Sequence, residues 1–205
     1  MASADRAGPG WLEYCPVMAT SDAKSDLRDY LQGGREAMLW KLEGLSEYDA
    51  RRPLTPTGTN LLGLVKHLAV WEFRYFGDVF GRPAAEVPPW PDENGMWAAA
   101  DESREYIIGW YRRAWAHADA TVDALSMDAV GHVPWWGNAE VTLHHIMVHV
   151  VVDTQRHAGH ADIVRELIDG TAGLLPGADN MPERDEAGWA ERRDQVEQAA
   201  RAAAS

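Results

Sequence analysis

The feature that most constrains this chain is a long apolar segment around residue 150 that carries ionisable side chains on one side. Residues 140–168 have helical patterning and are apolar almost all round from 143 to 152, as is typical of a central, buried helix. At about 100° per residue, four ionisable residues fall within one narrow stripe of this helix. They are His149, Asp153, His157 and His160. Burying such groups without partners is costly, so the stripe requires partners elsewhere in the fold.

Three other segments have the periodicity of amphipathic helices. Apolar residues recur at three- and four-residue steps over residues 22–45, 61–80 and 102–125. The connections are roughly ten to twenty residues long and contain proline and glycine, which end helices. We therefore predict an all-α fold, a four-helix bundle with long inter-helix loops, and we find no strand pattern long enough to compete. Residues 182–203 favour a short C-terminal surface helix with Trp189 as its one large anchor.

Two tyrosines and a glycine pair stand out in the predicted helices. The periodicity places Tyr30 and Tyr106 on the apolar faces of the first and third helices. The Gly33-Gly34 pair weakens the first helix, because each glycine costs about 1 kcal/mol relative to alanine in a helix interior. We expect both tyrosines in the core and a weak point of the first helix at the glycine pair.

The segment 83–100 is a long proline-rich loop with Trp90 and Trp97 in it. Loops of this length are uncommon unless they cover a site. The alternative is a loop that its two tryptophans attach to the core, and the sequence supports both interpretations equally.

Length, charge and cysteine content narrow the class of protein. The 205 residues, 46 % hydrophobic, predict one domain with a core at about 22–170 and an extension at 171–205. A net charge of −13 disfavours binding to nucleic acid, because both partners would be negatively charged. The longest apolar run, 146–152, is too short to span a membrane. The single cysteine, Cys15, excludes an internal disulfide, and the N-terminus has no secretory signal pattern. These observations predict a cytoplasmic protein with small-molecule rather than nucleic-acid or membrane partners.

The stripe has the spacing of a metal site. Asp153 and His157 lie four residues apart, the spacing at which two side chains of one helix reach the same ion. A facing helix must supply the remaining ligand, and His67 is the one histidine of the apolar second helix. Spacing alone leaves a buried hydrogen-bond network without metal as an equal alternative. A lone histidine such as His67 is also more often a hydrogen-bonded core residue than a ligand.

Several short pieces of the chain, taken together, resemble one family. They are Gly44-Leu45-Ser46, Arg52-Pro53-Leu54, Leu64-Val65-Lys66-His67-Leu68, Arg156-His157-Ala158-Gly159-His160-Ala161-Asp162, Arg165-Glu166 and Asp169-Gly170. In combination, over roughly residues 24–170, they resemble the DinB-like superfamily. Within it they are most similar to the mycothiol-dependent branch of S-transferases and maleylpyruvate isomerase-like proteins.

The resemblance implies a helical bundle that holds one divalent metal on His67, Asp153 and His157. At the position of Asp153 the family has histidine or, in the mycothiol branch, usually glutamate. Aspartate keeps the carboxylate but is one methylene shorter, so His149 is the alternative ligand. Two histidines and a carboxylate suit zinc first, with nickel or iron as alternatives.

The activity that the resemblance implies is a metal-dependent transfer of a low-molecular-weight thiol, such as mycothiol, to a small electrophile. We expect His149 and His160 to move protons, and Trp71, Tyr75 and Arg156 to bind substrate. Further tryptophans are candidates for lining an apolar pocket. They are Trp90, Trp97, Trp135 and Trp136.

Two other functions fit the same residues. The metal of a hydrolase or isomerase would activate water or polarise a carbonyl, and such activity would not require a thiol. A non-catalytic metal-containing binding protein, with an exposed bundle face available for a homodimer, would consume no electrophile at all.

Overall fold

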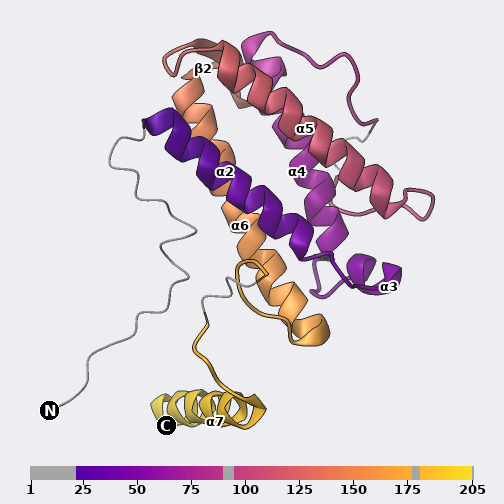
Figure 1. The fold of residues 1–205 in the computed structure, drawn as a ribbon, viewed down its shortest axis with the longest axis vertical. Coiled ribbons are helices and arrows are strands. Elements are labelled where there is room, and N and C mark those ends of the chain that lie inside the picture. The colour runs from indigo at the N-terminus through magenta and orange to yellow at the C-terminus, as the bar shows by residue number, and fades with distance from the viewer. Residues whose placement is uncertain (1–21, 90–94, 177–180, 205) are drawn as a thin grey trace, which may run out of the picture.

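Long helices packed side by side form the body of the protein. The computed structural model describes residues 22–89, 95–176 and 181–204. Figure 1 shows the four long helices together. They are α2 (Ala23–Trp40), α4 (Leu61–Phe76), α5 (Arg104–Ala124) and α6 (Leu143–Asp169). Because α4 packs against both α5 and α6, and α2 packs against α6, the expected all-α bundle is confirmed.

Capping side chains set where these helices begin. Each accepts a hydrogen bond from a backbone N–H of the first turn, which satisfies a donor that the helix leaves open. They are Asp22, Asn60, Ser103 and Thr142. Further helices are the short α3 (Glu47–Arg51), the 3-10 helix η1 (Asp78–Phe80) and the 18-residue α7 (Glu186–Ala203).

A small β-hairpin precedes α6, although the sequence shows no strand pattern long enough to compete with the helices. Strands β1 (Val130–Val133) and β2 (Ala139–Thr142) pair antiparallel, with Val130 opposite Thr142. The strands are only four residues long, which is why no alternating pattern stood out. As a consequence α6 begins at Leu143 rather than near residue 140.

The hairpin holds two tryptophans in a fixed place. Its connection is the 3-10 helix η3 (Pro134–Trp136), followed by Gly137 and Asn138, both with positive φ. Val133 and Val141 point inward and are 0 % and 7 % exposed. Trp135 and Trp136 are thereby attached to the core through the strands on either side of them.

One glycine of the pair in α2, Gly34, has a packing reason. A Cβ at Gly34 would lie 2.8 Å from the Thr154 side chain of α6, so glycine permits the close approach of these two helices. In contrast, Tyr30 and Tyr106 are 51 % and 41 % exposed, and the expectation that they lie in the core is wrong.

The described part of the loop before α5 is held by polar contacts rather than by the ring of Trp97. Trp97 is 53 % exposed, while its backbone carbonyl accepts a hydrogen bond from Lys66 Nζ at 3.1 Å. A Cβ at Gly63 would lie 2.0 Å from the carbonyl oxygen of Met96, so the loop crosses α4 in direct backbone contact. Trp90 lies outside the described residues.

Part of the sequence that resembles the family has a structural role. Arg165 of α6 donates to the carbonyls of Lys41 and Glu43 at 3.0 and 2.8 Å and pairs with Asp169 at 2.8 Å. Lys41 in turn pairs with Asp162 at 2.8 Å. These contacts fasten the C-terminal half of α6 to the turn that follows α2.

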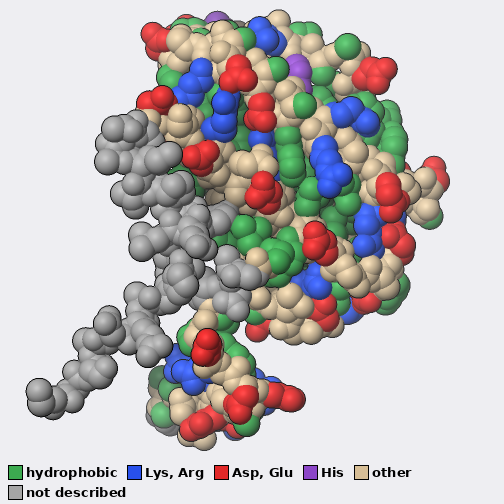
Figure 2. Space-filling model, in the orientation of Figure 1, with side chains coloured by type: hydrophobic (Ala, Val, Ile, Leu, Met, Phe, Trp, Pro, Cys, Tyr) green, Lys and Arg blue, Asp and Glu red, His purple; other side chains and the backbone are tan. Residues whose placement is uncertain are grey.

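One face of the molecule carries charged side chains of both signs together with hydrophobic ones. Figure 2 shows acidic and basic side chains interspersed on the face that it presents.

The predicted C-terminal helix is present as α7, but none of its residues is buried, and Trp189 is 36 % exposed. Among the described helices, none has the length and hydropathy needed to cross a bilayer.

A buried ion pair lies at the centre of the bundle. Arg35 of α2 and Glu72 of α4 are 0 % and 2 % exposed, and their side chains are paired. Arg35 also pairs with Asp119 of α5 at 3.0 Å, and its guanidinium lies 5.6 Å from the centre of the Trp115 ring. Burial raises the pKa of Glu72 from 4.5 to about 7, although Arg35 opposes the shift.

Removing one member of this pair should destabilise the fold strongly. Arg35→Met keeps the aliphatic volume but leaves the Glu72 carboxyl without its cation. We expect a loss of about 3–5 kcal/mol in the free energy of unfolding, measured by urea denaturation. Arg28→Met is the control, because Arg28 also joins α2 to α5, through Asp123, in an exposed pair. An equal loss in both variants would contradict a special role for the buried pair.

The raised pKa of Glu72 should also appear in the pH dependence of stability. A carboxyl whose folded pKa exceeds its unfolded value stabilises the fold below the unfolded pKa, and this contribution is lost as the pH rises through the folded pKa. The histidines His117, His149 and His157, whose pKa burial lowers, act in the opposite direction. The informative quantity is therefore the difference in unfolding free energy between the wild type and Glu72→Gln. From about pH 4.5 to about pH 8 it should fall by on the order of 3 kcal/mol. A constant difference would contradict the raised pKa.

Candidate metal centre

Three side chains from two helices meet at one point of the bundle. The nitrogen and oxygen atoms that His67 of α4 and Asp153 and His157 of α6 can offer a metal lie within 4.8 Å of one another. Asp153 Oδ1 is 3.5 Å from His157 Nε2, and Asp153 Oδ2 is 4.0 Å from His67 Nε2. The two imidazole rings are 4.8 Å apart between centroids. The structure thus brings together the three residues that the sequence selected.

The donor set and its environment fit a divalent cation. Zinc takes two imidazoles and a carboxylate at about 2.0–2.2 Å, which puts neighbouring ligand atoms roughly 3.3–3.6 Å apart. The separations between Asp153 and the histidines are close to this range. Burial lowers the pKa of His157, which favours the neutral ring that binds metals. Each carboxylate oxygen of Asp153 lies nearest a different histidine, so the carboxylate is placed between the two imidazoles.

The alternative ligand, His149, has a different partner. Its Nε2 lies 2.9 Å from the hydroxyl of Tyr75, and the two rings are 4.8 Å apart. Burial lowers the pKa of His149 and raises that of Tyr75, which favours a neutral pair. Within the described part of the chain, His149 is not in the group of residues that could share one ion.

An aromatic surface, which we call the aromatic wall, adjoins the three residues. It consists of Trp71, Tyr75, Trp135 and Trp136. Trp71 lies 6.1 Å from His67 and 5.5 Å from Trp135, and Tyr75 contacts both hairpin tryptophans at 5.3 and 5.8 Å. Tyr75 is 6 % exposed, whereas the tryptophans are half-buried and retain surface for a ligand.

The remaining predicted site residues lie on the outer side of α6. His160 is exposed, with its ring 5.4 Å from that of His157. Arg156 is exposed as well, and its charge contributes to the lowered pKa of His157. Both residues are therefore in contact with solvent beside the three candidate ligands.

One residue next to the wall escaped prediction. The guanidinium of Arg74 lies 4.9 Å from the centre of the Trp71 ring and 4.3 Å from that of Trp135. Its spacing of seven residues from His67 places it on the same side of α4, and this was the available signal. Its contact with Trp135 depends on the hairpin, which the sequence did not reveal.

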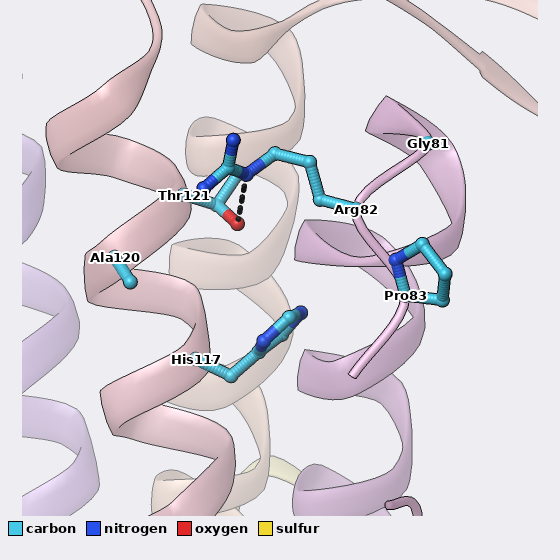
Figure 3. Close-up of a pocket in the computed structure, with 6 residues that line it drawn as sticks. All are labelled: Gly81, Arg82, Pro83, His117, Ala120 and Thr121. Carbon is cyan, nitrogen blue, oxygen red and sulfur yellow. Dashed lines mark hydrogen bonds between the residues drawn. The ribbon is translucent and has the colours of Figure 1, made fainter. Parts of the chain in front are cut away.

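A hollow elsewhere on the described surface offers less chemistry than the candidate metal centre. A depression of about 440 Å³ lies between α5 and the segment after η1, and none of the predicted site residues lines it. Figure 3 shows Arg82 donating to the hydroxyl of Thr121, at 3.3 Å, above the ring of His117. Burial lowers the pKa of His117, so this hollow combines one neutral imidazole with an arginine that is already hydrogen-bonded.

Comparison with known proteins identifies the family and a similar fold. A search among curated proteins finds no match. A solved structure titled as a conserved protein of locus from Enterococcus faecalis aligns with a TM-score of 0.53 at 16 % identity, covering 74 % of this chain and all of that one. This likeness supports the fold alone. The sequence profile of the family described as mycothiol S-transferase matches residues 26–170, which include all three candidate ligands. The chain belongs to the mycothiol S-transferase family.

Proposed function

We propose that this protein is a metal-dependent transferase that joins a low-molecular-weight thiol, mycothiol or a similar compound, to a small electrophile. The observation that carries the proposal is the meeting of His67, Asp153 and His157 beside a half-buried aromatic surface. Membership of the mycothiol S-transferase family supports the thiol as co-substrate.

The three ligands would leave coordination positions open, as in catalytic rather than structural zinc sites. A divalent cation bound there favours the thiolate form of a coordinated thiol, and the thiolate is the nucleophile. In the reaction, the sulfur forms a bond to the electrophilic carbon and the leaving group departs with its bonding electron pair. The thiol proton is transferred to a base and then to water.

The chain offers two bases for that proton. His149 is favoured in its neutral form by burial, and its hydrogen bond with Tyr75 fixes the ring. His160 is exposed and would exchange its proton directly with solvent. We assign to His149 the role of accepting the thiol proton, and to His160 the role of releasing that proton to solvent.

The metal assignment predicts a bound ion that depends on both helices. Elemental analysis of the purified protein should find about one equivalent of divalent metal, and His67→Ala and Asp153→Ala should each lose it because two ligands hold an ion poorly. His144→Ala is the control, since His144 is an exposed histidine of α6, the helix that carries Asp153. Metal retained in Asp153→Ala would make His149 the working ligand. Metal absent from the wild type, even after incubation with zinc, nickel or iron, would overturn the proposal.

The transferase assignment predicts consumption of a model electrophile only when thiol is present. With chlorodinitrobenzene and mycothiol or cysteine, the absorbance of the thioether product reports the rate. His67→Ala should lower kcat/KM by at least about 100-fold, the upper range for loss of a residue that merely supports a ligand. His149→Gln should lower it by about 100-fold or more, as expected for a proton-transfer residue, and His144→Ala should leave it unchanged. Hydrolysis of esters without thiol would instead favour a hydrolase.

A further inference from the structure

The outward side of α6 carries exposed apolar residues along most of its length, which we call the outer stripe. At about 100° per residue they fall within about 100° of the helix circumference. They are Val148, Val152, Gly159, Ile163 and Leu167. The four larger side chains are between 38 % and 64 % exposed, and a Cβ at Gly159 would meet no other atom within 4 Å. Apolar residues that recur on one face of a helix are typical of a surface that packs against another element.

The C-terminal helix α7 has an apolar side of its own. Its members lie within about 60° of one another on the helix. They are Trp189, Val196, Ala200 and Ala203. None of the residues of α7 is buried, and Figure 1 shows this helix apart from the four long helices. Since most helical stability in proteins comes from packing an amphipathic face, α7 lacks its main source of stability in this position.

The outer stripe and α7 match in length and are joined by a sufficient length of chain. At a rise of about 1.5 Å per residue, the stripe from Val148 to Leu167 is about 28 Å long and α7 is about 27 Å long. Residues 170–185 connect α6 to α7. In extended form this connection spans up to about 53 Å, so α7 can turn back and lie antiparallel on α6. Because the two helices share one chain, their effective concentration is high.

One antiparallel register brings large residues of α7 against gaps in the stripe. With Trp189 between Ile163 and Leu167, Val196 falls level with Gly159, where no side chain occupies the space. The alanines at the end of α7 then run toward the N-terminal half of the stripe. Placing a large residue opposite a small one is how facing helices interdigitate.

The flanks of the two helices carry opposite charges in this register. Flanks on the same side of an antiparallel helix pair face each other, and charged residues there select the partner and its orientation. One flank places Arg192 level with Asp162, and the other places Glu197 level with Arg156. Arg193 also falls on the second flank, and Glu197 four residues further along α7 offsets its charge.

Both carboxylates in these facing pairs already have a partner and can take a second one. Asp162 receives Lys41 Nζ on Oδ1, and its side chain is 40 % exposed. Glu197 receives Arg201 Nε on Oε1, and both side chains are exposed to solvent. An ionised carboxylate has two oxygens that accept several hydrogen bonds, so each can accept a further arginine or lysine donor.

We propose that α7 folds back antiparallel onto the outer stripe of its own chain, with Trp189 between Ile163 and Leu167. In this docked position α7 lies alongside Arg156 and His160, on the solvent side of the candidate metal centre. Docking depends on apolar contact between two helices and on the charges beside them. It does not depend on the proposed transferase activity.

Hydrogen exchange of the full-length protein tests the docking. Backbone amides of α7 should exchange at least about tenfold more slowly in the wild type than in Ile163→Asp, which puts a carboxylate where Trp189 packs. Because Ile163 is 60 % exposed, this substitution should leave the bundle folded, and thermal unfolding checks that it does. Gln198→Asp is the matched control and should keep the slow exchange, since Gln198 lies on the side of α7 opposite Trp189.

Cross-linking identifies the chain to which α7 docks. In a Cys15→Ser background, Gly159→Cys combined with Val196→Cys should be joined by a short bis-maleimide within a single chain. The combination of Gly159→Cys with Gln198→Cys should react much less, because the second cysteine then faces away from α6. Mass spectrometry of the digested product distinguishes a link within one chain from a link between two.

The outcomes separate docking within the chain from its rivals. Slow exchange that Ile163→Asp abolishes, together with a link inside one chain, supports the proposal. Exchange of α7 that is as fast in the wild type as in Ile163→Asp would overturn it. Equal acceleration in Ile163→Asp and Gln198→Asp would also contradict it, because the effect would not depend on the apolar side of α7. A link only between two chains would make a second copy the occupant of the stripe and overturn docking within one chain.

Discussion

The buried pairing of Arg35 with Glu72 determines how α4 is rotated in the bundle. Turning α4 about its axis would leave two desolvated charges without partners, a cost that packing alone does not impose. With Glu72 directed to the centre, the residues on another face of α4 have a set direction. They are His67, Trp71, Arg74 and Tyr75. The candidate metal centre and the aromatic wall therefore depend on a contact in which neither takes part.

The sequence predicted the long helices and two of the candidate ligands, Asp153 and His157, from a spacing of three or four residues along one helix. The third candidate, His67, was selected as the histidine of the apolar second helix, and the resemblance to a family supported that choice. Contacts between segments with no shared periodicity were not visible. The pairing of Arg35 with Glu72 and the hairpin strands of four residues belong to this class, and the exposure of Tyr30 reflects the same limit.

The sequence pieces that resemble the family divide into two groups in the structure. His67 and His157 lie at the candidate metal centre. Arg165 and Asp169 instead fasten the end of α6 to the turn after α2, through the backbone carbonyls of Lys41 and Glu43. A family signature of this kind thus records both chemistry and the attachment that keeps α6 in register, and only the geometry separates the two.

The four residues of the aromatic wall come from two elements, the helix α4 and the hairpin before α6. Trp71 and Tyr75 belong to a long helix that also carries a candidate ligand, so substitutions there act on the metal centre as well. Trp135 and Trp136 belong to a thirteen-residue excursion, residues 130–142, that carries none of the three candidate ligands. A change in the length or tip of this hairpin would therefore alter the aromatic wall without removing any of the three candidate ligands.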